Sequence, residues 1–185
     1  DGCRLEVPIV GALCAKDDEG EMLAEPAGPG APVVAQERAG LSAALQAGMR
    51  HCLARGSAAL LVSADIPGVP AGALQRAAAL LGQGVDVVLG PGHDGGYWLI
   101  GVREQHPGLF DGIPWSTDRV LEASLTRCRE LALDVRLLEP WRDVDTMDDV
   151  AALADGLETL PGRRTAAVLS RLTLPGALFL ALVAV

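Results

Sequence analysis

The stretch from Leu60 to Gly101 constrains the fold more strongly than any other part of the chain. It holds two short apolar runs, and the first of them, Ala59–Val62, is followed closely by Asp65. The second run, Asp86–Leu89, gives way to a glycine-rich loop over residues 90–96. Strands that are buried on both faces read as continuous apolar runs, and their ligands gather at their carboxyl ends. We therefore expect two consecutive strands to deliver a carboxylate and a glycine-rich loop to one crevice.

The segments around this stretch alternate between helical and strand patterns. Ser116 or Thr117 is a suitable cap for one of the helices, because a hydroxyl can accept from the free N–H groups of the first turn. Alternation of this kind is typical of an α/β fold with a mostly parallel sheet. The spacing of apolar residues predicts helices over 41–54, 71–81, 118–131 and 147–157, and further strands over 97–102 and 135–138.

The length of 185 residues fits one domain, which we place over residues 1–160. A boundary rich in proline, glycine and arginine separates it from a tail over residues 161–185. The thirteen almost wholly apolar residues 173–185 are fewer than the about twenty that a transmembrane helix needs. We expect a helix that docks on the domain or the opening of a longer segment, and a membrane anchor only if the natural chain continues.

The charge of the chain argues against several kinds of partner. Fifteen basic and 24 acidic side chains give a net charge of -9, which disfavours binding to nucleic acid or to anionic membrane. An acidic enzyme that handles phosphate needs a metal ion or local donors to hold it. The four cysteines form no CxxC pair, which argues against a zinc site and favours reduced thiols. Together with charged residues where a signal peptide would be apolar, this predicts a cytoplasmic protein.

Carboxylates stand at three places where strands or loops are expected to end. Asp65 follows the first central strand, Asp94 lies inside the glycine loop, and Asp143 and Asp145 form a D-x-D pair before a predicted helix. Alternation along an extended segment would direct both carboxylates of that pair the same way. Oxygen ligands of this kind suit Mg²⁺ or Mn²⁺, which bind through a few carboxylates together with substrate phosphates and water.

Each of these residues also has a structural interpretation. Asp65 could cap the helix that follows it, and Asp94 could form an ordinary tight turn with the two glycines after it. The D-x-D pair could be a solvated loop or a helix cap. Trp115 could pack beneath the loop while a neighbouring hydroxyl caps the helix. The functional interpretation therefore depends on the joint occurrence of these residues.

Four segments together resemble one known family. They are SADIPGVP, DVVLGPGHDGGYWLIGV, LFDGIPWSTDRVL and RDVDTMDDV, which follow one another between about Gln36 and Leu153. This succession is similar to the GT-A-fold transferases described as radical-SAM/selenodomain-associated transferases, which are related to molybdenum-cofactor and phospholactate guanylyltransferases. The pair DGGYWLIG and GIPWST is the most specific part. DVDTMDDV is similar to the D-x-D-T-P-E-D-L signature of such domains, with Met147 in place of the proline.

The resemblance implies a GT-A-like, three-layer α/β/α sandwich and a metal-dependent nucleotidyl- or glycosyltransferase. Its partners would be a nucleotide or nucleotide-sugar donor and a small hydroxyl or phosphate acceptor. The resemblance further implies that Mg²⁺ or Mn²⁺ is held by Asp65, Asp143 and Asp145, and that Asp65 and Asp94 are the catalytic side chains. The substrate-binding residues that it implies are Gly95, Gly96, Tyr97, Trp115, Ser116 and Thr117.

The beginning of the chain departs from the family pattern. The family opens with a strand and a basic, glycine-containing loop of the type K-T-R-L, which holds the nucleotide. The only lysine here, Lys16, is followed by Asp17, Asp18 and Glu19, whose charge is wrong for cradling phosphates. Two alternatives stay open: a guanylyltransferase of the phospholactate or molybdenum-cofactor type, and a truncated, non-catalytic domain that acts as a binding module.

Overall fold

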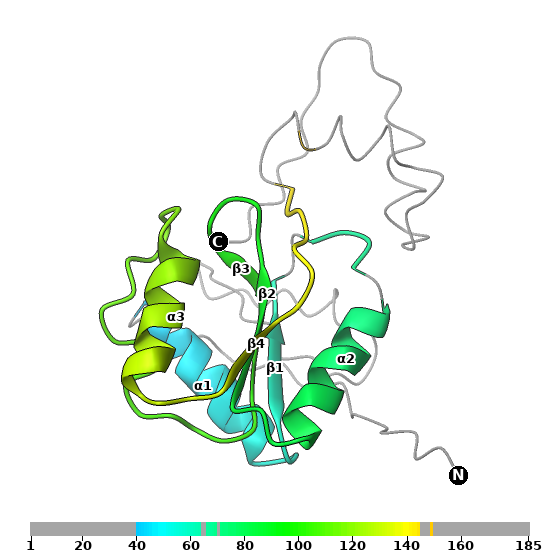
Figure 1. The fold of residues 1–185 in the computed structure, drawn as a ribbon, viewed down its shortest axis with the longest axis vertical. Helices are drawn as coiled ribbons and strands as arrows, with labels where there is room; N and C mark the ends of the chain where they lie inside the picture. The colour runs from blue at the N-terminus through cyan, green and yellow to red at the C-terminus, as the bar shows by residue number, and fades with distance from the viewer. Residues whose placement is uncertain (1–39, 64–65, 70, 145–148, 150–185) are drawn as a thin grey trace, which may run out of the picture.

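A computed structural model describes residues 40–63, 66–69, 71–144 and 149 of the chain. Helices and strands alternate in it except at β2 and β3, which follow each other directly. The predicted elements within this part form with boundaries shifted by no more than two residues (Figure 1). Apart from residue 149, the helix predicted over 147–157 lies outside the described residues, as does the tail from residue 161. The elements are α1 (Leu41–Leu53), β1 (Ala59–Val62), α2 (Ala71–Gly82), β2 (Val87–Pro91), β3 (Tyr97–Val102), α3 (Val120–Glu130) and β4 (Val135–Leu137).

The described strands form one mixed sheet in the order β1-β3-β2-β4. β3 is antiparallel to both of its neighbours, whereas β2 and β4 pair in parallel. The predicted mostly parallel sheet is not confirmed, and the connection between β2 and β3 explains the difference. Residues 92–96 alone join these strands, whereas a parallel crossover takes a dozen or more residues. The glycine loop is therefore the tip of a hairpin.

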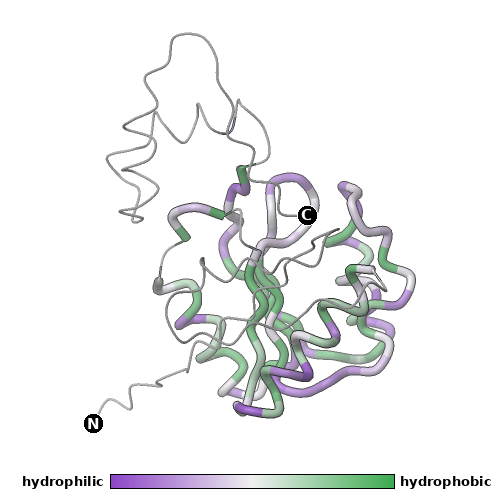
Figure 2. Tube along the Cα trace, turned by 180° about the vertical axis from the view of Figure 1, so that it is seen from behind, coloured by the Kyte–Doolittle hydropathy of each residue, from purple (hydrophilic) through white to green (hydrophobic). Residues whose placement is uncertain are grey.

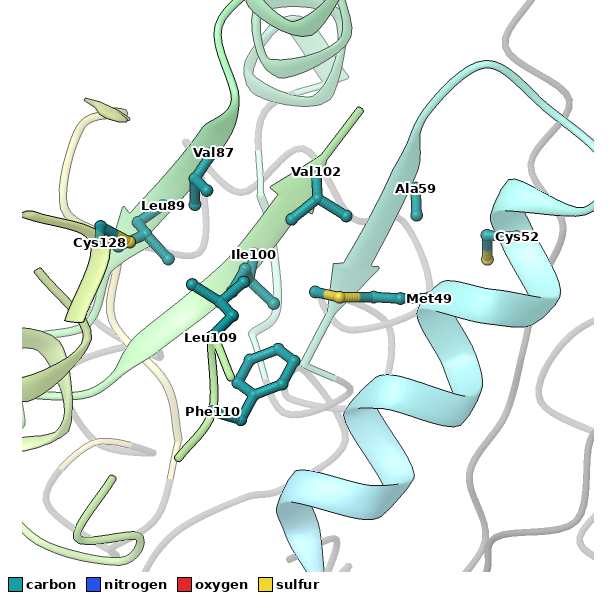
Figure 3. Close-up of a cluster of buried hydrophobic side chains, with 10 residues drawn as sticks. All are labelled: Met49, Cys52, Ala59, Val87, Leu89, Ile100, Val102, Leu109, Phe110 and Cys128. Carbon is teal, nitrogen blue, oxygen red and sulfur yellow. The ribbon is translucent and has the colours of Figure 1, made fainter. Parts of the chain in front are cut away.

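Two apolar cores lie on opposite faces of the sheet, because side chains alternate along each strand. On one face, Val87 and Leu89 pack with Met49 of α1 and Cys128 of α3 (Figure 3). On the other face, Val88 packs with side chains of α2 that include Ala77 and Leu81. Every residue of β2 is buried, as the continuous apolar run predicted. Hydrophobic residues accordingly concentrate along the central strands in Figure 2.

The direction of the strands decides which ends share an edge. Since β1 and β2 are both antiparallel to β3, and β4 is parallel to β2, these three strands run the same way. Their carboxyl ends therefore meet at one edge of the sheet, where the hairpin tip and the segment after β4 rise together in Figure 1. The shared edge that the sequence predicted is thus present. Within the described part of the chain, no helix is long and apolar enough to cross a membrane.

Candidate active site at the carboxyl edge of the sheet

The glycine loop is the central feature of this edge, and Asp94 shapes it. The Gly96 amide donates to the Asp94 carboxylate at 2.9 Å, and the Gly92 amide donates to the Gly96 carbonyl at 3.0 Å. This is the side-chain turn typical of aspartate, in which the carboxylate replaces a backbone acceptor. Asp94 is also exposed to solvent. The structure therefore supports the turn interpretation of Asp94, and the predicted catalytic role stays a prediction.

Gly95 fixes the loop against the first turn of α3. Its carbonyl accepts the Leu121 amide at 2.8 Å, and its φ of +89° lies in the left-handed region. A Cβ at this position would lie 2.0 Å from the Asp118 carbonyl oxygen. Only glycine fits both the backbone angle and the contact. The amino end of α3 and the hairpin tip consequently form one docked unit.

Trp115 lies beside this unit, is partly buried, and contacts Ser42, Tyr97 and Phe110. Its indole N–H donates to the Ser42 hydroxyl at 2.7 Å, and that hydroxyl donates to the Phe110 carbonyl at 3.3 Å. Its ring meets Tyr97 edge-to-face, with centroids 6.3 Å apart, and the Phe110 ring at 6.0 Å. The side chain therefore joins α1 to the segment before α3. Any contact of Trp115 with a substrate stays a prediction.

The Tyr97 side chain points into the protein, although its backbone opens β3 directly after the loop. Burial raises the pKa of its hydroxyl well above the usual range, and the nearby Ser124 hydroxyl only partly offsets this. Neither hydroxyl makes a hydrogen bond of ordinary geometry. On α3, which also carries Ser124, burial raises the pKa of the Cys128 thiol to about 11. Tyr97 and Cys128 therefore stay protonated at neutral pH, which argues against either as a base or nucleophile.

Ser116 and Thr117 are both exposed just before α3. Thr117 donates its hydroxyl proton to the Pro114 carbonyl at 2.7 Å and accepts from the Arg119 amide at 3.3 Å. Ser116 has a φ of +60°, a conformation that costs energy for a residue with a side chain. The helix begins at Val120 after Arg119, without a side-chain cap. The prediction that Ser116 or Thr117 caps α3 is therefore wrong. The reason is that Thr117 closes a separate turn ahead of the helix.

Trp141 brings the remaining segments of the edge together, and the sequence interpretation missed it. Its backbone amide donates to the Pro91 carbonyl at 3.0 Å, and it forms a parallel bridge with Gly92. Its indole N–H donates to the Pro67 carbonyl at 3.2 Å. One residue thus ties the segment after β4 to the glycine loop and to the segment after Asp65. Its position at the head of the WRDVDT loop was the available signal.

Only part of the predicted metal site can be placed. Asp143 is partly buried. It follows Trp141 by two residues, and Trp141 forms a bridge with Gly92 of the glycine loop, so Asp143 belongs to the segment that reaches this loop. Asp65 and Asp145 lie outside the described residues. A partly buried carboxylate at an edge shared by several loops is a suitable oxygen donor for Mg²⁺ or Mn²⁺. The described part of the predicted ligand set is this one carboxylate, and the metal site stays a prediction.

A surface groove of about 460 Å³ runs along α3, next to the Ser116–Thr117 turn. Arg127 crosses it, donating to the Gly108 carbonyl at 2.7 Å and to Glu130 at 2.9 Å. This groove depends on how α3 packs against the preceding loop, so no local sequence signal predicted it. The residues that line it are Asp111, Gly112, Ile113, Pro114, Arg119, Glu122, Ala123, Thr126, Arg127 and Glu130.

The fold and this edge define an α/β domain whose docked loops gather where parallel strands end, the usual place for a ligand site. The chain belongs to a bacterial family described as "Uncharacterized protein conserved in bacteria (DUF2064)", whose sequence pattern matches residues 5–117, which are 113 of the 185 residues. The matched range includes the glycine loop and the Ser116–Thr117 turn. It ends before Asp143.

A crystal structure of a protein from Desulfovibrio desulfuricans G20 is similar to this chain. That protein is provisionally described as a nucleotide-diphospho-sugar transferase. The TM-score is 0.73 and the sequence identity 32%, over 85% of this chain and 70% of the other. A comparison with proteins of curated function finds no significant match. The general resemblance to GT-A-like transferases is thus supported, and the narrower resemblance to radical-SAM-associated transferases stays a prediction.

Proposed function

We propose that this protein is a transferase that uses a nucleotide-diphospho-sugar or a related nucleotide-activated donor. The observation that carries the proposal is the edge at which the glycine loop, the Ser116–Thr117 turn and the segment after Trp141 come together. The similarity to the Desulfovibrio protein supports the same class of activity. We expect the helices on both faces of the sheet to make up a three-layer α/β/α sandwich of the GT-A type.

The proposed roles follow from the position of each side chain. Asp65, Asp143 and Asp145 would hold Mg²⁺ or Mn²⁺, whose charge would stabilise the leaving nucleoside diphosphate or pyrophosphate. The backbone of Gly95 and Gly96 would line the acceptor or sugar, because glycine lets a ligand approach closely. The exposed hydroxyls of Ser116 and Thr117 face the acceptor side in this proposal. Catalysis would come mainly from positioning and from neutralising charge.

In this proposal Asp94 has a structural role in the glycine loop and a chemical role toward the acceptor. Its carboxylate holds the loop through the Gly96 amide, and its exposure leaves it open to an acceptor hydroxyl. If it accepts the proton of that hydroxyl, its charge is needed as well as its shape. An amide in the same place would keep the turn but lose the proton acceptor.

Product formation tests the proposal directly. The purified chain is incubated with nucleotide sugars, GTP or CTP as donors and with a panel of small hydroxyl and phosphate compounds as acceptors, with and without Mn²⁺, and acceptor-dependent release of nucleoside phosphate or pyrophosphate is measured. We expect metal-dependent release by the wild type and a loss of about a hundredfold or more in Asp143→Asn. Asp134→Asn is the matched control, because Asp134 is an exposed carboxylate at the amino end of β4. Equal activity of the two variants would contradict the proposed metal site.

A further inference from the structure

A second cluster of polar side chains lies at the other end of the hairpin. β2 and β3 are antiparallel, and Val87 pairs with Val102. The residue before β2 therefore lies beside the residues that follow β3. This register brings Asp86 next to the loop that carries Glu104 and His106. The cluster is separated from the glycine loop by the whole length of the two strands.

The three side chains of this cluster offer ligand atoms that lie within 4.8 Å of one another. Asp86 and His106 are partly buried, whereas the Glu104 side chain is 62% exposed. The Nε2 atom of His106 is shielded from solvent and has no hydrogen-bond partner. A buried ring nitrogen without a partner is costly, and a metal ion is one way to satisfy an imidazole.

We propose that Asp86, Glu104 and His106 form a binding site for a divalent transition metal ion, of which zinc is the best fit. One imidazole and two carboxylates are a ligand set that suits zinc, with water completing the tetrahedron. Ligands at zinc distances lie about 3.4 Å apart in a tetrahedron, so the ligand atoms, which lie within 4.8 Å of one another, must approach by up to about 1.4 Å. The long, exposed Glu104 side chain supplies that movement. Mg²⁺ is a poor fit, because it prefers an octahedral set of oxygens.

Arg103 is the competitor for this cluster. Its guanidinium donates twice to one Asp86 carboxylate oxygen, at 2.9 and 2.7 Å, and lies 3.9 Å from Glu104. The second Asp86 oxygen accepts the Asp134 amide at 2.9 Å. Arg103 is 42% exposed, so it can turn into solvent without leaving a buried charge behind. A doubly charged ion would take its place between the two carboxylates, while the bond to Asp134 stays.

The site uses no thiolate, which is why the spacing of the cysteines gave no indication of it. A metal ion here would tie the start of β2 to the loop after β3. Since the glycine loop lies at the far end of the hairpin, the ion would act on stability and not on group transfer. Zinc binding and transferase activity are therefore separable in experiment.

Calorimetric titration with ZnCl₂ after removal of metals by a chelator tests the site. We expect binding of one zinc ion, a higher thermal midpoint with zinc than without, and no such effect of Mg²⁺. His106→Ala should weaken zinc binding by about tenfold or more, as should Glu104→Gln, which alters an exposed side chain with little risk to folding. Arg103→Ala should tighten binding, because it removes the competing charge.

His51→Ala is the matched control, because His51 lies on α1 and its ring contacts Arg55. It should leave the affinity for zinc unchanged. The proposal would be overturned by the absence of zinc binding to the folded chain, by binding that survives both His106→Ala and Glu104→Gln, or by equal losses in His51→Ala. A cobalt-loaded sample with a thiolate charge-transfer band would assign the metal to cysteines instead, and would contradict the proposal as well.

Discussion

The two ends of the β2–β3 hairpin differ in how they treat their polar groups. At the amino end of β2, Asp86 is paired with the Arg103 side chain and with a backbone amide, so its charge is matched within the protein. At the hairpin tip, backbone contacts hold the loop in place and Asp94 stays exposed, as do Ser116 and Thr117 in the turn before the docked helix α3. At the tip, backbone contacts fix the position of the loop and leave polar groups exposed for a ligand. At the other end, Asp86 already has an internal counter-ion in Arg103, which the proposed zinc ion would have to displace.

The largest expected effect is at the docking contact of the tip. Gly95→Ala places a methyl group 2.0 Å from the Asp118 carbonyl oxygen, at a φ of +89°. We expect the free energy of unfolding to fall by about 3 kcal/mol, from backbone strain and overpacking together. Chemical denaturation monitored by circular dichroism measures this loss.

Gly84→Ala is the matched control for that change. Gly84 has a φ of +100°, and a Cβ there would meet nothing within 4 Å. It should cost only the backbone strain, about 1 kcal/mol. If the two variants lose equal stability, the docking of the tip onto α3 contributes nothing and the comparison between the two ends fails.

The next effect is at the indole that anchors the segment before α3. Trp115→Phe removes the hydrogen bond to the Ser42 hydroxyl and part of a partly buried ring. We expect a loss of about 2 kcal/mol, and a smaller loss of about 1 kcal/mol for Ser42→Ala. A double-mutant cycle on unfolding free energies measures their coupling. Strictly additive losses would show that the bond does not hold this segment.

A smaller effect on stability is expected at the turn of the glycine loop. Two substitutions of Asp94 there distinguish its hydrogen bond to the loop from its negative charge. Asp94→Ala removes the acceptor of the Gly96 amide and should cost about 1 kcal/mol. Asp94→Asn keeps an oxygen acceptor and should be nearly as stable as the wild type. Under the proposed function, Asp94→Asn should still lose turnover. An active Asp94→Asn protein would reduce Asp94 to a purely structural residue.

The smallest effect is expected at the paired end. The Asp134 backbone amide and the Arg103 guanidinium hold the pKa of Asp86 below its ordinary value. A carboxyl group with a lowered folded pKa stabilises the protein above its unfolded pKa, and this stabilisation is lost as pH falls through the folded pKa. In chelator, Asp86→Asn should therefore be less stable than the wild type at pH 7. The difference should shrink as the pH is lowered below about 4, and a constant difference would contradict the assigned cause.

The parts of the fold that could be predicted from the sequence are those in which burial leaves a local pattern. Strand β2, Val87–Pro91, is buried along its whole length, as its continuous apolar run predicted. The helical spacing of residues 41–54 located α1 to within one residue. The direction of β3 was not predicted, because apolar residues carry no sign of strand direction. The length of the glycine loop did carry that information, since residues 92–96 are too few for a crossover.

The candidate site was predictable in its location and less so in its contacts. Strand ends identified the edge with Asp94 and the glycines, because ligands collect where parallel strands finish. Trp141 and Ser42 were missed, since their partners are 74 and 73 residues away in the chain. The Asp86–His106 cluster was missed for a similar reason, because it exists only in the register that pairs Val87 with Val102.

The most direct test of the proposed function is donor binding by calorimetry. The folded chain is titrated with UDP-glucose, GTP and CTP, each with and without Mn²⁺, alongside Asp65→Ala. Under the proposed function, we expect one nucleotide to bind only in the presence of the metal ion and Asp65→Ala to abolish this binding. A folded chain that binds none of them with Mn²⁺, or binding that persists unchanged in Asp65→Ala, would contradict it.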